Sequence, residues 1–176
     1  MPASQYVQSL HQRWQLDKDV VQTRRTEDIA ASKVLGADWL HLDFPDCIYR
    51  VDPHTKRPLY TSDEEIFGDI NSADLNLIET IAAKLSDLPP GNRIIVPLTL
   101  GQHVDHQLTR QAAERCFSPT SLHYYEDYPY AQQNSAEQFI AQQKGIWLKR
   151  IIQLTDKSIT ARIQSIKCFH SQLSTF

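Results

Sequence analysis

The sequence predicts an α/β fold, in which a mostly parallel sheet carries helices on both faces. Apolar segments of strand length alternate along the chain with segments whose apolar residues recur at helical spacing. This alternation is typical of a parallel sheet with crossover helices. The length of 176 residues suits one domain with its own hydrophobic core.

The first half of the chain is expected to hold two helices, a strand and a long loop. Apolar residues at helical spacing over 7–14 predict a short opening helix. Thr23 can cap a second helix, which Gly36 would end in the left-handed conformation. Residues 39–44 alternate as a half-buried strand does. Residues 45–72 hold several prolines, and a connection of this length is usually a functional loop or a lid.

The second half is expected to alternate between helices and strands. Asp74 can cap a helix that the run Pro89–Pro90–Gly91 would end. The remaining elements are predicted from apolar runs and from helical spacing. They are a strand over 93–98, a helix over 108–116, a strand over 122–125, an edge strand over 147–154 and a last helix over 159–166.

Composition excludes several classes of protein. Apolar residues make up 41% of the chain and the formal charge is -3, so no net field attracts nucleic acid or an anionic membrane. The sequence shows no 18-residue apolar run and no secretory signal stretch, so a cytoplasmic protein is expected. Three widely spaced cysteines are expected to be free thiols in a reducing cytosol. They are Cys47, Cys116 and Cys168.

The run 97–106 carries the clearest chemical signal. An apolar strand ends at the Gly101 turn and delivers His103, Asp105 and His106 to the first turn of a helix. Open α/β sheets bind ligands at the carboxyl ends of their strands. Residues three apart are separated by roughly 60° around a helix axis, so the two imidazoles can share a face and serve a zinc site. The alternative is that Asp105 caps the helix and both histidines are solvated.

Five segments resemble one known family in the same order along the chain. They are Arg24–Asp28 (an R-x-x-E helix), Leu42–Asp46, the Gly101–Gln107 turn (an H-P-D-H motif), Tyr124–Tyr130 and Phe169–Gln172 (a Y-x-S-Q ending). Together these segments are similar to the LmbE-like (PIG-L) zinc-dependent N-acetyl-sugar deacetylases. The similarity covers nearly the whole chain, and the order of the segments is more specific than any one of them.

The resemblance implies a three-layer Rossmann-like fold, a zinc cofactor and a small sugar-like substrate. It implies that His106 is a zinc ligand, that His103 assists the tetrahedral intermediate and that Asp105 is a neighbouring polar partner. It also implies that Arg24 and Asp46 hold the sugar. The alternatives are that Arg24 is a solvated side chain of the first helical turn and that Asp46 is a turn residue.

The chain departs from the family at its beginning. Family members open with a strand that runs into A-H-P-D-D, which supplies a histidine and an aspartate to zinc and the aspartate general base. This sequence holds no such string, and His11 has neither the strand before it nor the aspartates after it. We therefore expect a single LmbE-like domain, residues 1–176, that is N-terminally incomplete and lacks its first strands.

The expected function follows from this resemblance. The complete family member would be a metal-dependent hydrolase that removes an N-acetyl group, and this chain alone would be inactive, because one protein ligand does not hold catalytic zinc. One alternative is a non-catalytic remnant that binds a carbohydrate or a protein through residues 124–130 and Arg24. Another is a different metallohydrolase, for example a phosphohydrolase with the same histidine pair, which would require further His or Asp ligands, although the remaining histidines lie on unrelated predicted elements. These are His41, His54, His123 and His170.

Overall fold

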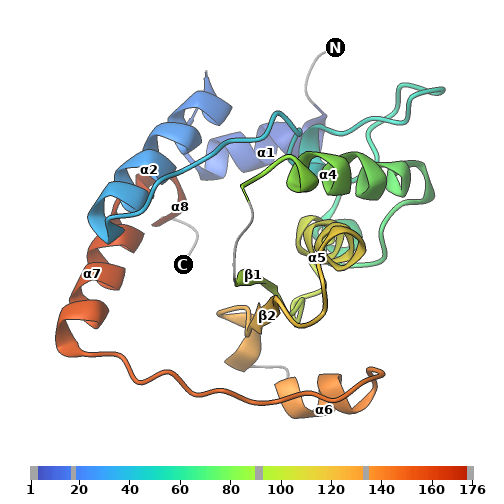
Figure 1. Ribbon diagram of the computed structural model, residues 1–176. Coiled ribbons are helices and arrows are strands. Elements are labelled where there is room, and N and C mark those ends of the chain that lie inside the picture. The colour runs from blue at the N-terminus through green and yellow to red at the C-terminus, as the bar shows by residue number, and fades with distance from the viewer. Residues whose placement is uncertain (1–3, 17–18, 90–92, 133–134, 174–176) are drawn as a thin grey trace. The chain divides into compact units, whose positions relative to one another are not determined.

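A computed structural model describes residues 4–16, 19–89, 93–132 and 135–173 (Figure 1). The chain forms two compact units, of which one combines Met1–Phe44 with Leu148–Phe176 and the other is Pro45–Trp147. The first unit holds α1 (Gln5–Arg13), α2 (Val20–Leu35), α7 (Asp156–Lys167) and α8 (His170–Leu173). The second holds η1 (Cys47–Tyr49), α3 (Asp63–Ile66), η2 (Ser72–Asp74), α4 (Asn76–Ser86), β1 (Ile94–Pro97), α5 (Val104–Cys116), β2 (Leu122–Tyr125), η3 (Tyr130–Gln132) and α6 (Ala136–Ala141).

A parallel strand pair forms the centre of the second unit. β1 and β2 pair in register from Ile94 opposite Leu122 to Pro97 opposite Tyr125, and α5 is the crossover between them. Small residues let α5 approach its neighbours closely, because Ala112 and Ala113 are fully buried. One core cluster lies between α4 and α5, and a second lies between α5 and the strands. The predicted strand–helix–strand unit is therefore confirmed, within a mixed α/β chain.

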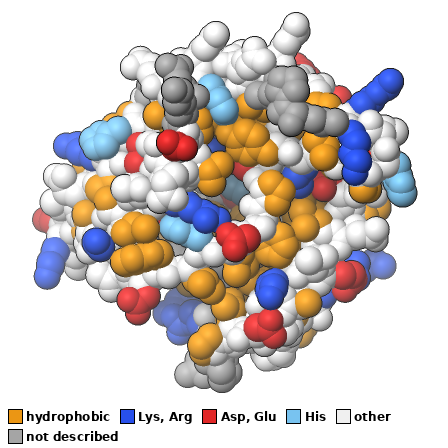
Figure 2. Space-filling view, turned by 90° about the horizontal axis from the view of Figure 1, so that it is seen from above, with side chains coloured by type: hydrophobic (Ala, Val, Ile, Leu, Met, Phe, Trp, Pro, Cys, Tyr) orange, Lys and Arg blue, Asp and Glu red, His pale blue; other side chains and the backbone are white. Residues whose placement is uncertain are grey.

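Two predicted strands are wrong. Residues 39–44 and 147–154 run without regular secondary structure. An extended segment becomes a strand only when a neighbouring strand takes up its backbone N–H and C=O groups, and among the described residues β1 and β2 form the one ladder. Several apolar side chains of these segments stay exposed: Leu40 is 64% and Ile152 67% accessible, whereas Leu42 and Phe44 are partly buried. On the face drawn in Figure 2, exposed hydrophobic side chains lie between charged ones.

The predicted helices α1, α2 and α7 of the first unit are confirmed, with one correction at a cap, whereas α8 was not predicted. Gly36 ends α2 with φ +67°, as predicted. The helix begins three residues before Thr23, which lies inside it and donates its N–H to the Asp19 carbonyl. Thr23 is therefore not the cap. α7 packs against α2, and the Thr155 side chain accepts from the Ser158 N–H at its start. None of the described helices combines the length and the apolar character that a bilayer span requires.

A buried carboxylate joins two of the motif segments within the first unit. Glu27, on α2, accepts hydrogen bonds from the Ser171 N–H (2.8 Å) and hydroxyl (2.6 Å), although the two residues are 144 positions apart. Both side chains are buried. The R-x-x-E helix and the Y-x-S-Q ending therefore supply the two halves of one structural tie.

The segment 45–72 is more ordered than the predicted loop. It holds η1 and α3, and an isolated antiparallel bridge joins Val51 to Pro58. Asp74, expected to cap a helix, instead ends η2, and its buried carboxylate pairs with Arg50 at 2.7 Å. The prediction for Asp74 is wrong because the ion pair takes the carboxylate away from the helix start. α4 ends at Ser86, and the predicted stop at residues 90 and 91 lies outside the described residues.

Candidate active site

The chain reverses sharply between β1 and α5, and one buried carboxylate holds this turn. Thr99 (φ +70°) and Gln102 (φ +56°) adopt the left-handed conformation, which non-glycine residues rarely enter. Oδ2 of Asp127 accepts the N–H groups of Thr99 (2.7 Å) and Leu100 (3.2 Å). Asp127 is 1% exposed. It follows β2, so the carboxyl ends of both strands contribute to one site, as parallel strands allow.

His103 caps α5. Its Nδ1 accepts the Asp105 N–H at 3.2 Å, so the alternative in which Asp105 caps the helix is wrong. The ring lies 5.3 Å from the Phe67 ring and 5.2 Å from the His106 ring, between ring centroids. Burial lowers the pKa of His103 below its usual value and outweighs the nearby Asp105 charge, which acts in the opposite direction. The neutral imidazole is therefore favoured, with its proton on Nε2.

His106 is oriented by Asp127. Its Nδ1 lies 2.6 Å from Oδ1 of Asp127, and its side chain is partly exposed. Burial raises the pKa of Asp127, but the hydrogen bonds from His106 and from two backbone amides outweigh it and hold the pKa below its usual value. Asp127 is therefore an ionised acceptor.

Asp105 connects the first turn of α5 to the segment 45–72. Its carboxylate accepts the Cys47 N–H at 3.1 Å and lies 2.6 Å from Nη1 of Arg50. The Arg50 guanidinium is almost fully buried, pairs also with Asp74 and lies over the Tyr60 ring, 5.4 Å from its centroid. Asp105 is thus held on two sides and helps to fix the start of the helix that carries both histidines.

The two predicted substrate contacts lie in different units. Asp46 is in the second unit, where Oδ1 accepts the Ile48 N–H (3.4 Å) at the start of η1 and lies 3.4 Å from the Cys47 sulfur. Arg24 is in the first unit, and its guanidinium lies over the Trp14 ring at 5.0 Å. The structure therefore brings Asp46 into the same unit as the histidine turn, and a sugar contact by Arg24 stays a prediction.

Sequence reasoning missed two residues of this site. Asp127 could have been found, because it follows a predicted strand whose carboxyl end had to meet that of the strand before the histidine turn. Arg50 had no such signal. It lies in an irregular segment, and its partners Asp74 and Asp105 lie 24 and 55 positions further along the chain.

A second group of side chains could hold a metal ion. It consists of Cys47, His103 and Asp105, each of which offers one ligand atom within 4.8 Å of those of the other two. Burial raises the pKa of the Cys47 thiol far above its usual value, and the carboxylates of Asp105 and Asp46 add to this effect. Since Arg50 already compensates Asp105, a cation at this group would compete with Arg50 for the Asp105 charge.

We expect Cys47 to resist alkylation in the folded chain, because it is 1% exposed and its thiolate is disfavoured. Cys116 and Cys168, which are partly exposed, would react with iodoacetamide at least about 100-fold faster at pH 8. Peptide mass spectrometry during a labelling time course measures the three rates. In a denaturant all three should become equal, and similar rates in the folded chain would contradict this burial.

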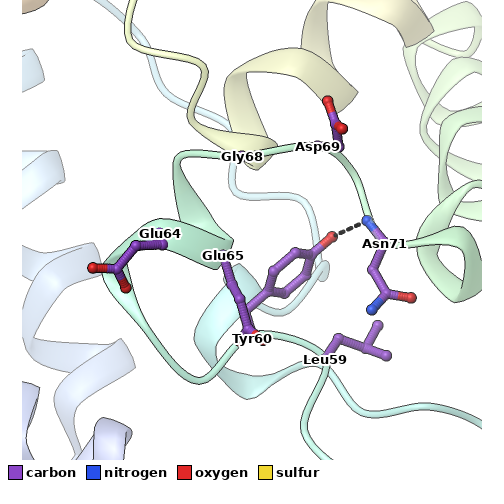
Figure 3. Close-up of a pocket in the computed structure, with 7 residues that line it drawn as sticks. All are labelled: Leu59, Tyr60, Glu64, Glu65, Gly68, Asp69 and Asn71. Carbon is purple, nitrogen blue, oxygen red and sulfur yellow. Dashed lines mark hydrogen bonds between the residues drawn. The ribbon is translucent and has the colours of Figure 1, made fainter.

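A small cavity lies beside the site in the segment 59–71 (Figure 3). Its volume is about 270 Å³, and the Tyr60 hydroxyl accepts the Asn71 N–H at its wall (3.1 Å). Gln107 on α5 donates to the Gly68 carbonyl at 2.7 Å, which ties this segment to the helix of the histidines. The lining residues are Leu59, Tyr60, Glu64, Glu65, Gly68, Asp69 and Asn71.

Comparison with known proteins identifies structural relatives. No protein family model matches the chain, and no curated protein does. A deacetylase from the biosynthesis pathway of teicoplanin is 26% identical, with a TM-score of 0.82 over 99% of this chain and 70% of that one. A zinc-inhibited form of the teicoplanin deacetylase Orf2 matches with the same values. The A40926 pseudoaglycone deacetylase Dbv21 is 25% identical, with a TM-score of 0.64 over 99% of this chain and 66% of that one. The resemblance to the LmbE-like family is thus confirmed by structure, since the chain has the fold of these deacetylases over nearly its whole length and spans 70% of the teicoplanin enzyme.

Proposed function

We propose that the histidine turn belongs to the active site of a metal-dependent hydrolase that removes the acetyl group from an N-acetylated, sugar-like substrate. The site would lie in one LmbE-like domain, residues 1–176, in which the pair β1 and β2 would be part of a three-layer Rossmann-like fold. The observation that carries the proposal is the pair His103 and His106, whose rings lie 5.2 Å apart on separate anchors. The deacetylase activity in the names of the structural relatives supports the reaction class.

His106 fits the role of zinc ligand. A metal-binding histidine usually donates its other ring N–H to a carboxylate, which is the arrangement of His106 with Asp127. When bound, zinc would supply Lewis acidity and a nucleophile at neutral pH. Asp127 holds the imidazole so that Nε2 stays available as a donor of its lone pair.

His103 is suited to the developing negative charge on the substrate. Its Nδ1 is occupied by the Asp105 N–H, so the neutral ring presents Nε2–H as a hydrogen-bond donor. Attack on an amide carbonyl creates an oxyanion, and a donor placed in advance stabilises it. Asp105 assists by fixing the first turn of α5 through Arg50 and the Cys47 N–H.

Aromatic side chains beside His103 suit a sugar ring. Phe67 lies 5.3 Å from His103 and 5.7 Å from Tyr130, between ring centroids. Apolar ring faces pack against the C–H faces of a pyranose, and the Asp46 carboxylate can accept its hydroxyl groups. We propose that the substrate amide lies toward the histidines and that Phe67, Tyr130 and Asp46 hold the sugar, with Arg24 as a further contact.

Zinc titration of the purified chain, followed by NMR of the histidine side chains, tests the metal role. We expect zinc to shift the His106 signals more than those of the other histidines, and this largest shift should be lost in the His106→Ala variant. The matched Cys47→Ser variant removes a ligand of the competing metal group and leaves His106 in place. In this variant zinc should still shift the His106 signals. If Cys47→Ser abolished zinc binding and His106→Ala did not, the assignment of His106 would be wrong.

Acetate release from N-acetylglucosamine derivatives tests the reaction itself. Catalytic zinc takes about three protein ligands. Of the residues that the family resemblance assigns, His106 alone is a zinc ligand, so we expect this chain to release negligible acetate. Chelator-sensitive release by the purified chain would contradict that expectation.

The alternative function is carbohydrate binding without catalysis, and the Phe67–Tyr130 contact is the observation that favours it. Hydrogen exchange separates the two functions. Protection of residues 124–130 by an N-acetylated sugar, undiminished by a chelator, would favour binding alone.

A further inference from the structure

We infer that Asp127 is a positioning residue, and that the neighbouring His103 and His106 are held in opposite tautomers. His106 carries its proton on Nδ1 and presents an Nε2 lone pair, whereas His103 carries its proton on Nε2 and presents an N–H. The use of this arrangement in hydrolysis rests on the proposed function, but the arrangement itself does not.

The two oxygens of Asp127 have separate tasks. Oδ2 accepts the Thr99 and Leu100 N–H groups, while Oδ1 lies 2.6 Å from Nδ1 of His106. An ionised carboxylate offers acceptors only, so Nδ1 of His106 must be the donor. The carboxylate is 1% exposed, and water therefore does not compete for this hydrogen bond. In the neutral ring the proton stays on Nδ1, and Nε2 keeps its lone pair.

The anchor of His103 has the opposite polarity. Its Nδ1 lies 3.2 Å from the Asp105 backbone nitrogen, and a backbone N–H is a donor only. Nδ1 of His103 must therefore accept, which leaves the proton on Nε2. One turn of α5 thus presents a lone pair and an N–H from two rings 5.2 Å apart. A cation and a developing oxyanion require these two different groups.

The Asp127→Asn variant separates this role from a purely structural one. The amide has the shape of the carboxylate, and its oxygen can keep accepting the Thr99 and Leu100 N–H groups. Its NH₂ group then faces His106, whose Nδ1 has to accept. The His106 proton is expected to move to Nε2, while His103 keeps its tautomer and serves as an internal control.

Long-range ¹H–¹⁵N NMR of the full chain, at a pH where the rings are neutral, identifies the protonated nitrogen of each histidine. We expect opposite tautomers in the wild type and a switch confined to His106 in Asp127→Asn, with zinc affinity at His106 about 10–100-fold weaker. A wild-type His106 protonated on Nε2 would overturn the inference, and this measurement requires no variant. So would an unchanged His106 tautomer in a folded Asp127→Asn.

Two further results separate the inference from the proposed function. If the tautomer switches and zinc binding does not change, the inference about Asp127 stands and the zinc role of His106 is wrong. If Asp127→Asn does not fold, Asp127→Glu replaces it. The longer carboxylate should keep the wild-type tautomer, and a switch in that variant would contradict the inference.

Discussion

Replacing Arg50 by methionine is expected to lower the free energy of unfolding by about 3–5 kcal/mol. The Arg50 side chain is 7% exposed, and its guanidinium pairs with Asp74 at 2.7 Å and with Asp105 at 2.6 Å. Methionine fills a similar volume but carries no charge, so the buried carboxylate of Asp74 and the partly buried one of Asp105 lose their compensation. Urea denaturation monitored by circular dichroism measures the change.

The matched control is Arg115→Met in the same unit. Arg115 pairs with Glu79, and both side chains are more than half exposed, so its loss should cost no more than about 1 kcal/mol. Equal losses in the two variants would contradict the role of Arg50. Because Asp105 lies in the first turn of α5, Arg50→Met should also shift the NMR signals of His103, whereas Arg115→Met should not.

Gly101→Ala is expected to destabilise the chain by about 1–3 kcal/mol through overpacking. A Cβ atom at this position would lie 2.4 Å from Cγ and Cδ2 of Tyr130, far inside van der Waals contact. Tyr130 packs against the core cluster that contains Leu98 and Leu100, so its ring cannot move away without losing these contacts. Thermal unfolding and the Tyr130 ring signals in NMR measure the stability loss and the displacement.

A double-mutant cycle with Tyr130→Ala isolates the clash. In the Tyr130→Ala background the methyl group of Gly101→Ala meets no ring, so the second substitution should cost much less than in the wild type. Additive losses would mean that the turn, and not the contact with Tyr130, requires glycine. Phe67 contacts the Tyr130 ring, so sugar binding should also weaken in each variant that displaces or removes this ring.

Local patterns predicted the elements whose partners are close in sequence. Gly36 ends α2 because glycine enters the left-handed conformation at low cost. β1, α5 and β2 were predicted because a segment with helical spacing lies directly between two apolar runs of strand length. The segment 39–44 alternates as a half-buried strand does, and 147–154 is rich in residues typical of strands, yet neither is a strand. Alternation reports two unlike faces, whereas a strand also requires a hydrogen-bonding neighbour.

The sequence by itself determined that His103, Asp105 and His106 share the first turn of a helix that follows a buried strand, because helix geometry is local. Only the tertiary structure decided what each side chain does there. Asp127 reaches His106 from beyond the next strand, and Arg50 reaches Asp105 from an irregular segment. Such contacts depend on which elements become neighbours, and hydrophobic packing over the whole unit settles that. The histidine turn was therefore predictable from the sequence, but Arg50 and the proton positions and charges that give the site its chemistry were not.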